Sequence, residues 1–119
     1  MTNKNIEDIN FFQFGIKLNT ISLSDVTYNV PNNSGIYVIY ENNKMIKIGQ
    51  TMHLKNRLEG YYGCKRNDSE INKYITYLNR DNMVIQWMEY DSKSISDMET
   101  LLQKVVSLSG INLLCWKRK

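Results

Sequence analysis

The chain has few of the residues on which small secreted, zinc-binding and membrane proteins depend. Its 119 residues include only two cysteines and one histidine. Cys64 and Cys115 have neither the spacing of metal ligands nor the density of a disulfide scaffold. The N-terminus, Met1 to Asn5, lacks the apolar core of a signal peptide, and no apolar stretch approaches the roughly 20 residues that a membrane-spanning helix needs. We therefore expect a cytoplasmic protein with reduced thiols and no membrane association.

The composition is that of an ordinary globular domain, but the charge is unevenly distributed. Hydrophobic residues make up 42% and charged residues 23% of the chain, which is long enough to bury one core. Six basic residues and one acid lie between Lys44 and Arg66, so this segment carries +5 and the rest of the chain −2, for a net charge of +3. Tyr61 and Tyr62 lie among these charges, as aromatic side chains do on surfaces that bind nucleic acid. An ordinary solvated face would show the same excess of basic residues, so the charge alone does not establish nucleic-acid binding.

Two apolar runs separated by a short polar segment predict a β-hairpin. Residues 35–40 read GIYVIY and residues 45–49 read MIKIG, with ENNK between them. Runs of this kind around an asparagine-rich tetrapeptide are typical of two antiparallel strands joined by a tight turn. We expect the chemistry of the protein to lie on this hairpin.

The register of the hairpin is predicted from its apolar faces. If the faces coincide, Ile36 lies opposite Ile48, and the turn has an odd number of residues, most simply 41–43. The same register places Tyr37 directly across from Lys47, on the less apolar face. A phenol and an ammonium would then meet there.

The rest of the chain reads as helices and one further strand. Leucines, isoleucines and tyrosines at helical spacing predict the helices, and β-formers around a tryptophan predict the strand. In order, the elements after the hairpin are a helix over residues 52–62, a helix from 68 or 69 to 78, a strand over 83–90 beside the hairpin and a helix over 94–108. The order from the hairpin onward is ββααβα. Residues 1–33 are expected to form an extension that packs on a domain over residues 34–119.

Two charged residues stand within predicted apolar stripes. Glu99 lies four residues after Ile95 and three before Leu102, on the buried stripe of the last helix. A carboxylate there must be desolvated, paired or bound to a cation. Arg57 lies beside Leu58 on the helix after the hairpin and poses the same question. The ordinary alternatives are a salt bridge for Glu99 and a snorkelling surface side chain for Arg57.

A family resemblance joins these features. The chain resembles the GIY-YIG nuclease superfamily in its tripeptides GIY at 35–37 and KIG at 47–49, followed by Arg57, Tyr61 and Glu99. The resemblance covers most of the chain. It implies an α+β fold with a small three-stranded antiparallel sheet flanked by helices, and metal-dependent hydrolysis of phosphodiester bonds. Lysine opens the second tripeptide, where the family name has tyrosine, and in this the chain is similar to some GIY-YIG restriction endonucleases.

The resemblance and the chemistry of phosphodiester hydrolysis together suggest a role for each residue. Tyr37 would be the general base, because an ammonium such as that of Lys47 nearby favours the phenolate. Arg57 would bind a phosphate oxygen, and Tyr61 would hydrogen-bond to the same phosphate or to the attacking water. Glu99 would hold one divalent cation, Mg²⁺ or Mn²⁺, whose other ligands are water and phosphate.

Lys55 and Asn112 complete the expected site. Lys55 would attract the DNA backbone, and the resemblance suggests Asn112 as a polar support near the metal that helps to bind the substrate. A core tyrosine and a capping asparagine are equally open interpretations of Tyr61 and Asn112. His53 is expected to be exposed or to cap the helix after the hairpin.

We therefore expect a divalent-metal-dependent DNA endonuclease. The alternative is a nucleic-acid-binding or regulatory module that keeps the nuclease fold and cleaves little or nothing. The sequence carries no recognisable zinc finger or helix-turn-helix. Strand preference, sequence specificity and partnership with a second copy or with a recruiting protein therefore stay open.

Overall fold

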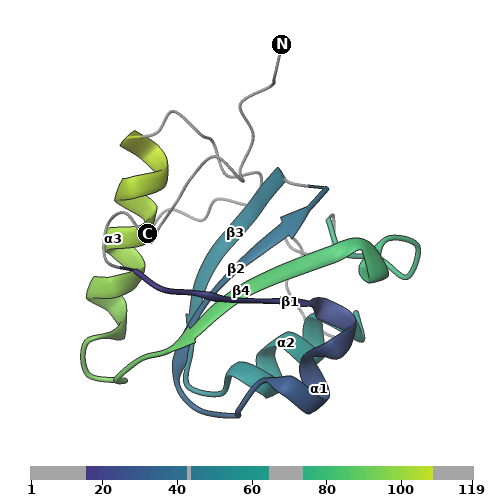
Figure 1. Ribbon diagram of the computed structural model, residues 1–119, viewed down its shortest axis with the longest axis horizontal. Helices are drawn as coiled ribbons and strands as arrows, with labels where there is room; N and C mark the ends of the chain where they lie inside the picture. Colours follow the sequence, from purple (N-terminus) through teal and green to yellow (C-terminus); the bar gives the residue numbers. More distant parts are fainter. Residues whose placement is uncertain (1–15, 43, 65–73, 109–119) are drawn as a thin grey trace.

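The protein combines one antiparallel sheet with helices on both of its faces, which is an α+β architecture (Figure 1). The computed structural model describes residues 16–42, 44–64 and 74–108. Its elements are, in chain order, β1 (Asn19–Ser22), the 3-10 helix η3 (Leu23–Asp25), α1 (Val26–Asn29), β2 (Gly35–Glu41), β3 (Lys44–Thr51), α2 (Leu54–Tyr62), the 3-10 helix η5 (Arg80–Asn82), β4 (Met83–Glu89) and α3 (Ile95–Leu108). The expected last strand and last helix are each confirmed to within one residue.

The sheet has four strands in the order β1-β4-β2-β3, where three were expected. The additional strand is β1, in which Asn19 lies opposite Trp87 and Ser22 opposite Val84 of β4. It is only four residues long, and its first two residues are exposed, so it has no alternating apolar pattern to reveal it. Leu23, which follows β1 directly, is buried in the core. The segment before the hairpin therefore contributes both a strand of the sheet and a side chain that packs on the domain. The domain boundary at residue 33 stays a prediction.

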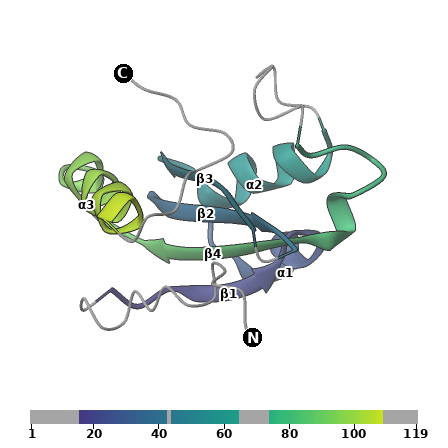
Figure 2. The same ribbon diagram turned by 90° about the horizontal axis from the view of Figure 1, so that it is seen from above.

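Helices cover both faces of the sheet, so β2 is buried on both sides. In Figure 2, α3 lies at one face and α2 with α1 at the other. On the α2 side, Tyr37 and Ile39 of β2 pack with Leu58. On the α3 side, Ile36 packs with Leu102. The expectation that Tyr37 lies on the less apolar face of the hairpin is therefore wrong, because Tyr37 has no exposed surface.

The register of the hairpin differs from the prediction by two residues. Tyr37 lies opposite Gly49, and Lys47 lies opposite Ile39. The pairing shifts between Ile39 and Tyr40, which leaves Ile46 as an extra residue in a β-bulge. The prediction placed an extra residue in the turn, which would then have three residues. The structure places the extra residue in β3, because Glu41 pairs with Lys44 and only residues 42 and 43 lie between them. A bulge of this kind has no sequence signal here, because Ile46 is apolar and is buried on the α2 side.

The second predicted helix is wrong in the part that the structure describes. Residues 65–73 lie outside the described residues, and Tyr74 to Leu78 form turns that lead into η5. The Asn79 side chain organises these turns: its Oδ1 accepts a bond from the Thr76 backbone N–H at 2.8 Å, and its Nδ2 donates to the Tyr74 carbonyl at 2.7 Å. An asparagine amide thus satisfies backbone groups that a helix would have paired, as asparagine commonly does in turns.

Helix α2, which carries three of the candidate residues, is held at both ends. At its start, the Asn56 backbone N–H donates to Asn32 Oδ1 at 2.9 Å. At its end, Arg80 Nη1 donates to the Tyr62 carbonyl at 3.0 Å. These bonds satisfy groups that a helix terminus leaves unpaired. Among the described residues, no helix is long and apolar enough to span a membrane, and the cytoplasmic location stays a prediction.

Candidate active site

Three of the predicted site residues converge on one hydroxyl group. Tyr37 Oη lies 2.7 Å from Tyr61 Oη, and Arg57 Nη1 donates to Tyr37 Oη at 3.4 Å. The two tyrosine rings meet edge to face, with centroids 5.8 Å apart and an angle of 63° between them. Arg57 and Tyr61 are four residues apart on α2, so both side chains point to the same side of the helix, toward β2. The two tyrosines are buried, whereas Arg57 is half-buried and reaches solvent.

The environment of Tyr37 opposes ionisation of its hydroxyl. Burial raises the pKa of Tyr37 well above its usual value, and the neighbouring Tyr61 raises it further. Arg57 acts in the opposite direction, but its effect is smaller. Lys47 shares the Tyr37 face of the sheet but lies two residues along β3 from the position opposite Tyr37, a diagonal separation of about 7–8 Å between Cα atoms. The predicted direct pairing of Tyr37 with Lys47 is therefore wrong.

Arg57 keeps its charge beside the two phenols. Burial acts to lower the pKa of Arg57, but its interactions with Tyr37 and Tyr61 outweigh this and raise the pKa. A guanidinium has five N–H donors, so bonds to two hydroxyls leave others available to a ligand. The cluster thus presents one positive charge at the half-exposed end of a buried tyrosine pair.

The glycine of each tripeptide is required by close packing. A Cβ atom at Gly49 would lie 2.9 Å from Tyr37 Cε1 and still closer to Tyr37 Cζ and the hydroxyl oxygen. A Cβ atom at Gly35 would overlap Leu54 and the Met88 carbonyl. The ring of Tyr37 therefore lies directly on the β3 backbone, a position that only glycine opposite allows.

We expect Gly49→Ala to destabilise the fold and to displace the Tyr37 hydroxyl. The added methyl group overlaps a ring that is fully buried, and such overpacking costs about 1–3 kcal/mol. Thermal unfolding measures the loss. The control is Gly60→Ala within α2, where alanine favours the helix by about 1 kcal/mol. Equal thermal stability of Gly49→Ala and the wild-type protein would contradict the close approach of Tyr37 to β3.

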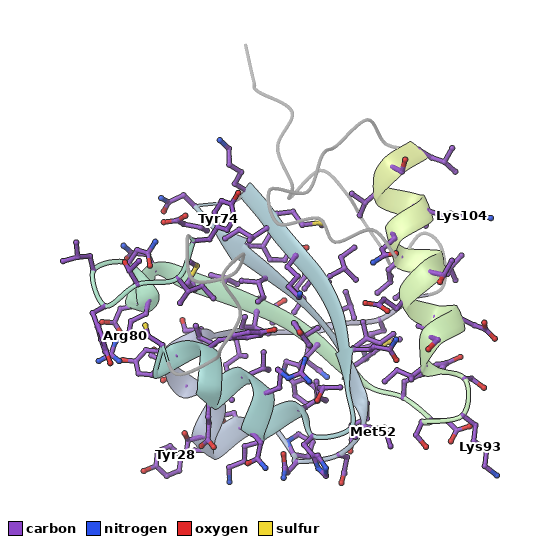
Figure 3. The ribbon with its side chains drawn as sticks, turned by 180° about the vertical axis from the view of Figure 1, so that it is seen from behind. Tyr28, Met52, Tyr74, Arg80, Lys93 and Lys104 are labelled. Carbon is purple, nitrogen blue, oxygen red and sulfur yellow. The ribbon has the colours of Figure 1, made fainter. Side chains whose placement is uncertain are left out.

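Glu99 lies on the other side of the sheet and is bonded to β3. It is half-buried on α3, and its Oε1 accepts a bond from Gln50 Nε2 at 2.9 Å. Gln50 follows Gly49 on the edge strand β3, and consecutive side chains of a strand point to opposite faces. One residue of β3 therefore contacts the tyrosine cluster and the next contacts Glu99. Figure 3 shows β3 between α2 and α3, with Met52 just beyond the end of the strand.

The donors around Glu99 suit a hard divalent cation with few protein ligands. Within the described residues, no three His, Cys, Asp or Glu side chains gather where they could hold a metal ion. The bond from Gln50 engages one oxygen of the Glu99 carboxylate and leaves the other as a ligand. Mg²⁺ commonly binds through one or two carboxylates and completes its shell with water and phosphate. The residues present thus fit such an ion. Within the described part of the chain, Glu99 bonds to a neutral amide, whereas the alternative interpretation required a salt bridge.

The remaining predicted residues are less informative. Lys55 is half-buried on α2. His53 is exposed at the start of α2 and makes no capping bond through its side chain, as expected for an exposed histidine. Asn112 lies outside the described residues. Nothing in the sequence pattern marks Gln50, and only its contact with Glu99 distinguishes it.

Comparisons with known proteins find chains of similar sequence and solved structures of similar fold. No family model matches the sequence. Over 75 residues, 62% of the chain, it is 33% identical to UvrABC system protein C of Helicobacter pylori strain ATCC 700392 / 26695 and 32% identical to that of strain P12. The chain covers only 11% of the length of each of these relatives.

The solved structures that it matches include the GIY-YIG N-terminal endonuclease domain of UvrC from Thermotoga maritima. Two point mutants of that domain, each bound to its catalytic divalent cation, match with TM-scores of 0.54 and 0.53 at 14% and 15% identity. The matches cover 81% and 80% of this chain and 96% and 93% of those. This chain has the GIY-YIG fold. The resemblance read from the sequence is confirmed, and the GIY-YIG fold here has a fourth strand at the edge of its sheet.

Proposed function

We propose that this protein is a divalent-metal-dependent DNA endonuclease that hydrolyses phosphodiester bonds. The observation that carries the proposal is the convergence of Tyr37, Tyr61 and Arg57 on one hydroxyl, next to the strand that also bonds Glu99. The relatives support it, because the matched domain of UvrC is an endonuclease domain bound to a catalytic divalent cation. Two phenols, a guanidinium and a carboxylate are groups that phosphodiester hydrolysis can use.

Each residue of the cluster has a distinct part in this proposal. Tyr37, once ionised, accepts the proton of the attacking water as the oxygen of that water bonds to phosphorus and the bond to the leaving oxygen breaks. Arg57 binds a non-bridging phosphate oxygen through donors that its tyrosine partners leave available. Tyr61 hydrogen-bonds to Tyr37 and orients it. Lys47, on the same face, adds positive charge that favours the phenolate.

Glu99 holds the divalent cation, and Lys55 and Asn112 contact DNA. A bound Mg²⁺ or Mn²⁺ supplies stabilisation of negative charge on the phosphoryl oxygens. Lys55 lies in the first turn of α2, and its ammonium adds positive charge that attracts the backbone of a nucleic acid. Partnership with a second copy of the chain or with a recruiting protein stays open.

A cleavage assay tests the proposed function directly. Purified protein is incubated with supercoiled plasmid, linear duplex and single-stranded DNA, each with Mg²⁺, with Mn²⁺ and with EDTA. We expect nicked or linear products with either metal and none with the chelator. Intact DNA under every metal condition, with DNA binding retained in a gel-shift assay, would contradict nuclease activity and favour a module that binds DNA without cleaving it.

Arg57→Lys is expected to reduce turnover more than DNA affinity. Lysine keeps the positive charge but loses the planar fork that bonds to several oxygens at once, so DNA is still attracted while the phosphate is less well oriented. We expect the cleavage rate at saturating DNA to fall about 10–100-fold, in line with the loss of one or two charge-assisted hydrogen bonds. The gel-shift dissociation constant should change by less than about threefold. Wild-type turnover in this variant would return Arg57 to an ordinary surface role.

A binding or regulatory module without cleavage is the second candidate. The observation that favours it is the complete burial of Tyr37 together with its raised pKa, which makes the hydroxyl a poor base in the chain alone. In that case Arg57 would still bind phosphate, and its neutralisation would weaken DNA binding without any effect of metal. The cleavage assay separates the two candidates.

A further inference from the structure

Gln50 joins the edge strand of the sheet to the helix that carries Glu99. Its Nε2 donates to Glu99 Oε1 at 2.9 Å and lies 3.1 Å from Ser96 Oγ. Ser96 Oγ in turn lies 3.4 Å from Gln50 Oε1. Both polar atoms of this amide therefore face α3, one turn of which supplies both partners.

We propose that Gln50 is a positioning residue that orients the Glu99 carboxylate and thereby sets the affinity for the divalent cation. The proposal rests on the proposed function of Glu99 as the metal ligand. An N–H group bonds to a carboxylate oxygen but repels a cation, so the amide engages Oε1 and directs the remaining oxygen outward as a ligand. Without this bond, a glutamate side chain with three rotatable bonds would have to be ordered by the ion itself.

The position of Gln50 in β3 extends the argument. The preceding residue, Gly49, lies against the ring of Tyr37, which no side chain larger than glycine would permit. The backbone at residues 49 and 50 is therefore held from the Tyr37 side. The bond from Gln50 to Glu99 holds the carboxylate to that same short stretch of backbone. Two adjacent residues of one strand thus set where the base and the metal ligand lie relative to each other.

Mn²⁺ binding measured by electron paramagnetic resonance tests the proposal without relying on activity. The full chain is titrated with Mn²⁺, alone and with a short DNA duplex, and the concentration of free Mn²⁺ is measured at each step. We expect Gln50→Leu, which keeps the approximate volume but removes the amide, to weaken Mn²⁺ binding about 10–100-fold, the range usual for partners that orient a metal ligand. Gln103→Leu is the matched control, because Gln103 lies one turn beyond Glu99 on α3, and it should bind Mn²⁺ like the wild-type protein.

The cation dependence of cleavage gives a second readout. Excess Mg²⁺ should restore most of the cleavage rate of Gln50→Leu, because the ligand itself is still present. It should not restore the rate of Glu99→Gln. If the leucine variant unfolds at a lower temperature than the wild-type protein, Gln50→Ala repeats both measurements with a smaller side chain.

The outcomes separate this proposal from the one on which it rests. Wild-type Mn²⁺ affinity in the Gln50 variants, with binding lost in Glu99→Gln, would overturn the role of Gln50 and leave Glu99 as the ligand. Unchanged Mn²⁺ binding in Glu99→Gln, or no binding by the wild-type protein even with duplex, would overturn the metal ligand and the role of Gln50 together.

Discussion

Glu99→Gln is expected to abolish metal-dependent cleavage while leaving the fold nearly intact. The amide keeps the volume of the side chain and can still accept the bond from Gln50, but it loses the charge that binds a divalent cation. Charge stabilisation by a bound metal is worth several kcal/mol in the transition state, so the cleavage rate should fall about 10³-fold or more. Cleavage rates with Mg²⁺ and with Mn²⁺ test the loss of activity, and thermal unfolding tests whether the fold stays intact.

Asp97→Asn is the matched control for Glu99→Gln. Asp97 lies on the same helix but is exposed, so the loss of its charge should leave cleavage within about twofold of the wild-type rate. Unchanged cleavage by Glu99→Gln would exclude Glu99 as the metal ligand. A large loss of thermal stability in Glu99→Gln would instead show that the carboxylate serves the packing of α3.

Tyr37→Phe is expected to remove cleavage and to cost little stability. Only the hydroxyl is lost, and the ring keeps its contacts with β3 and α2. The hydroxyl bonds to Tyr61 and Arg57, and a buried bond of this kind contributes about 1 kcal/mol. Loss of a general base lowers a rate by about 10²–10⁴-fold. Cleavage and thermal unfolding of the variant are the two measurements.

Tyr40→Phe is the control for this change. Tyr40 is also a buried tyrosine of β2, but its hydroxyl donates to Gln86 on the opposite face of the sheet. The two variants lose the same atom from the same strand, so only the location differs. Equal cleavage by the two phenylalanine variants would contradict the role of the Tyr37 hydroxyl.

The raised pKa of Tyr37 also predicts a pH profile. Below the pKa of an acid, its ionised fraction rises about tenfold for each pH unit. Since burial raises the pKa of Tyr37 well above 10.0, the wild-type cleavage rate should rise with about this slope from neutral to mildly alkaline pH without reaching a plateau. A plateau near neutral pH would mean that bound DNA or metal lowers the pKa of Tyr37, or that Tyr37 acts in its protonated form.

The residues that carry the candidate site could be found from the sequence. The alternating run of β2 and the i, i+4 spacing of Arg57 and Tyr61 on α2 are local patterns, and the structure confirms both elements. The position of Glu99 in the apolar stripe of α3 is also local, and the structure has its side chain half-buried there. Their roles in cleavage stay predictions.

The pairing of the site residues could not be found in the same way. The two-residue turn and the β-bulge at Ile46 together move Lys47 two residues away from the position opposite Tyr37. Nothing in the strand distinguishes Ile46 from the isoleucine two residues later. The bulge places the two isoleucines on opposite faces of the sheet, and both are buried because helices cover both faces. An argument that assumes one buried face per strand therefore assigns the wrong register.

The sequence by itself determined which residues form the strands of the hairpin, helix α2 and helix α3, because helical and strand periodicities depend on neighbours only a few residues away. Only the tertiary structure decided that the Tyr37 ring lies on Gly49, that its hydroxyl meets Arg57 and Tyr61, and that Gln50 bonds to Glu99 across 49 residues of chain. These contacts depend on the register of the hairpin and on the burial of both faces of the sheet. The register depends on how the two strands pair, and the burial depends on helices from other parts of the chain, so the pattern within one strand does not encode them.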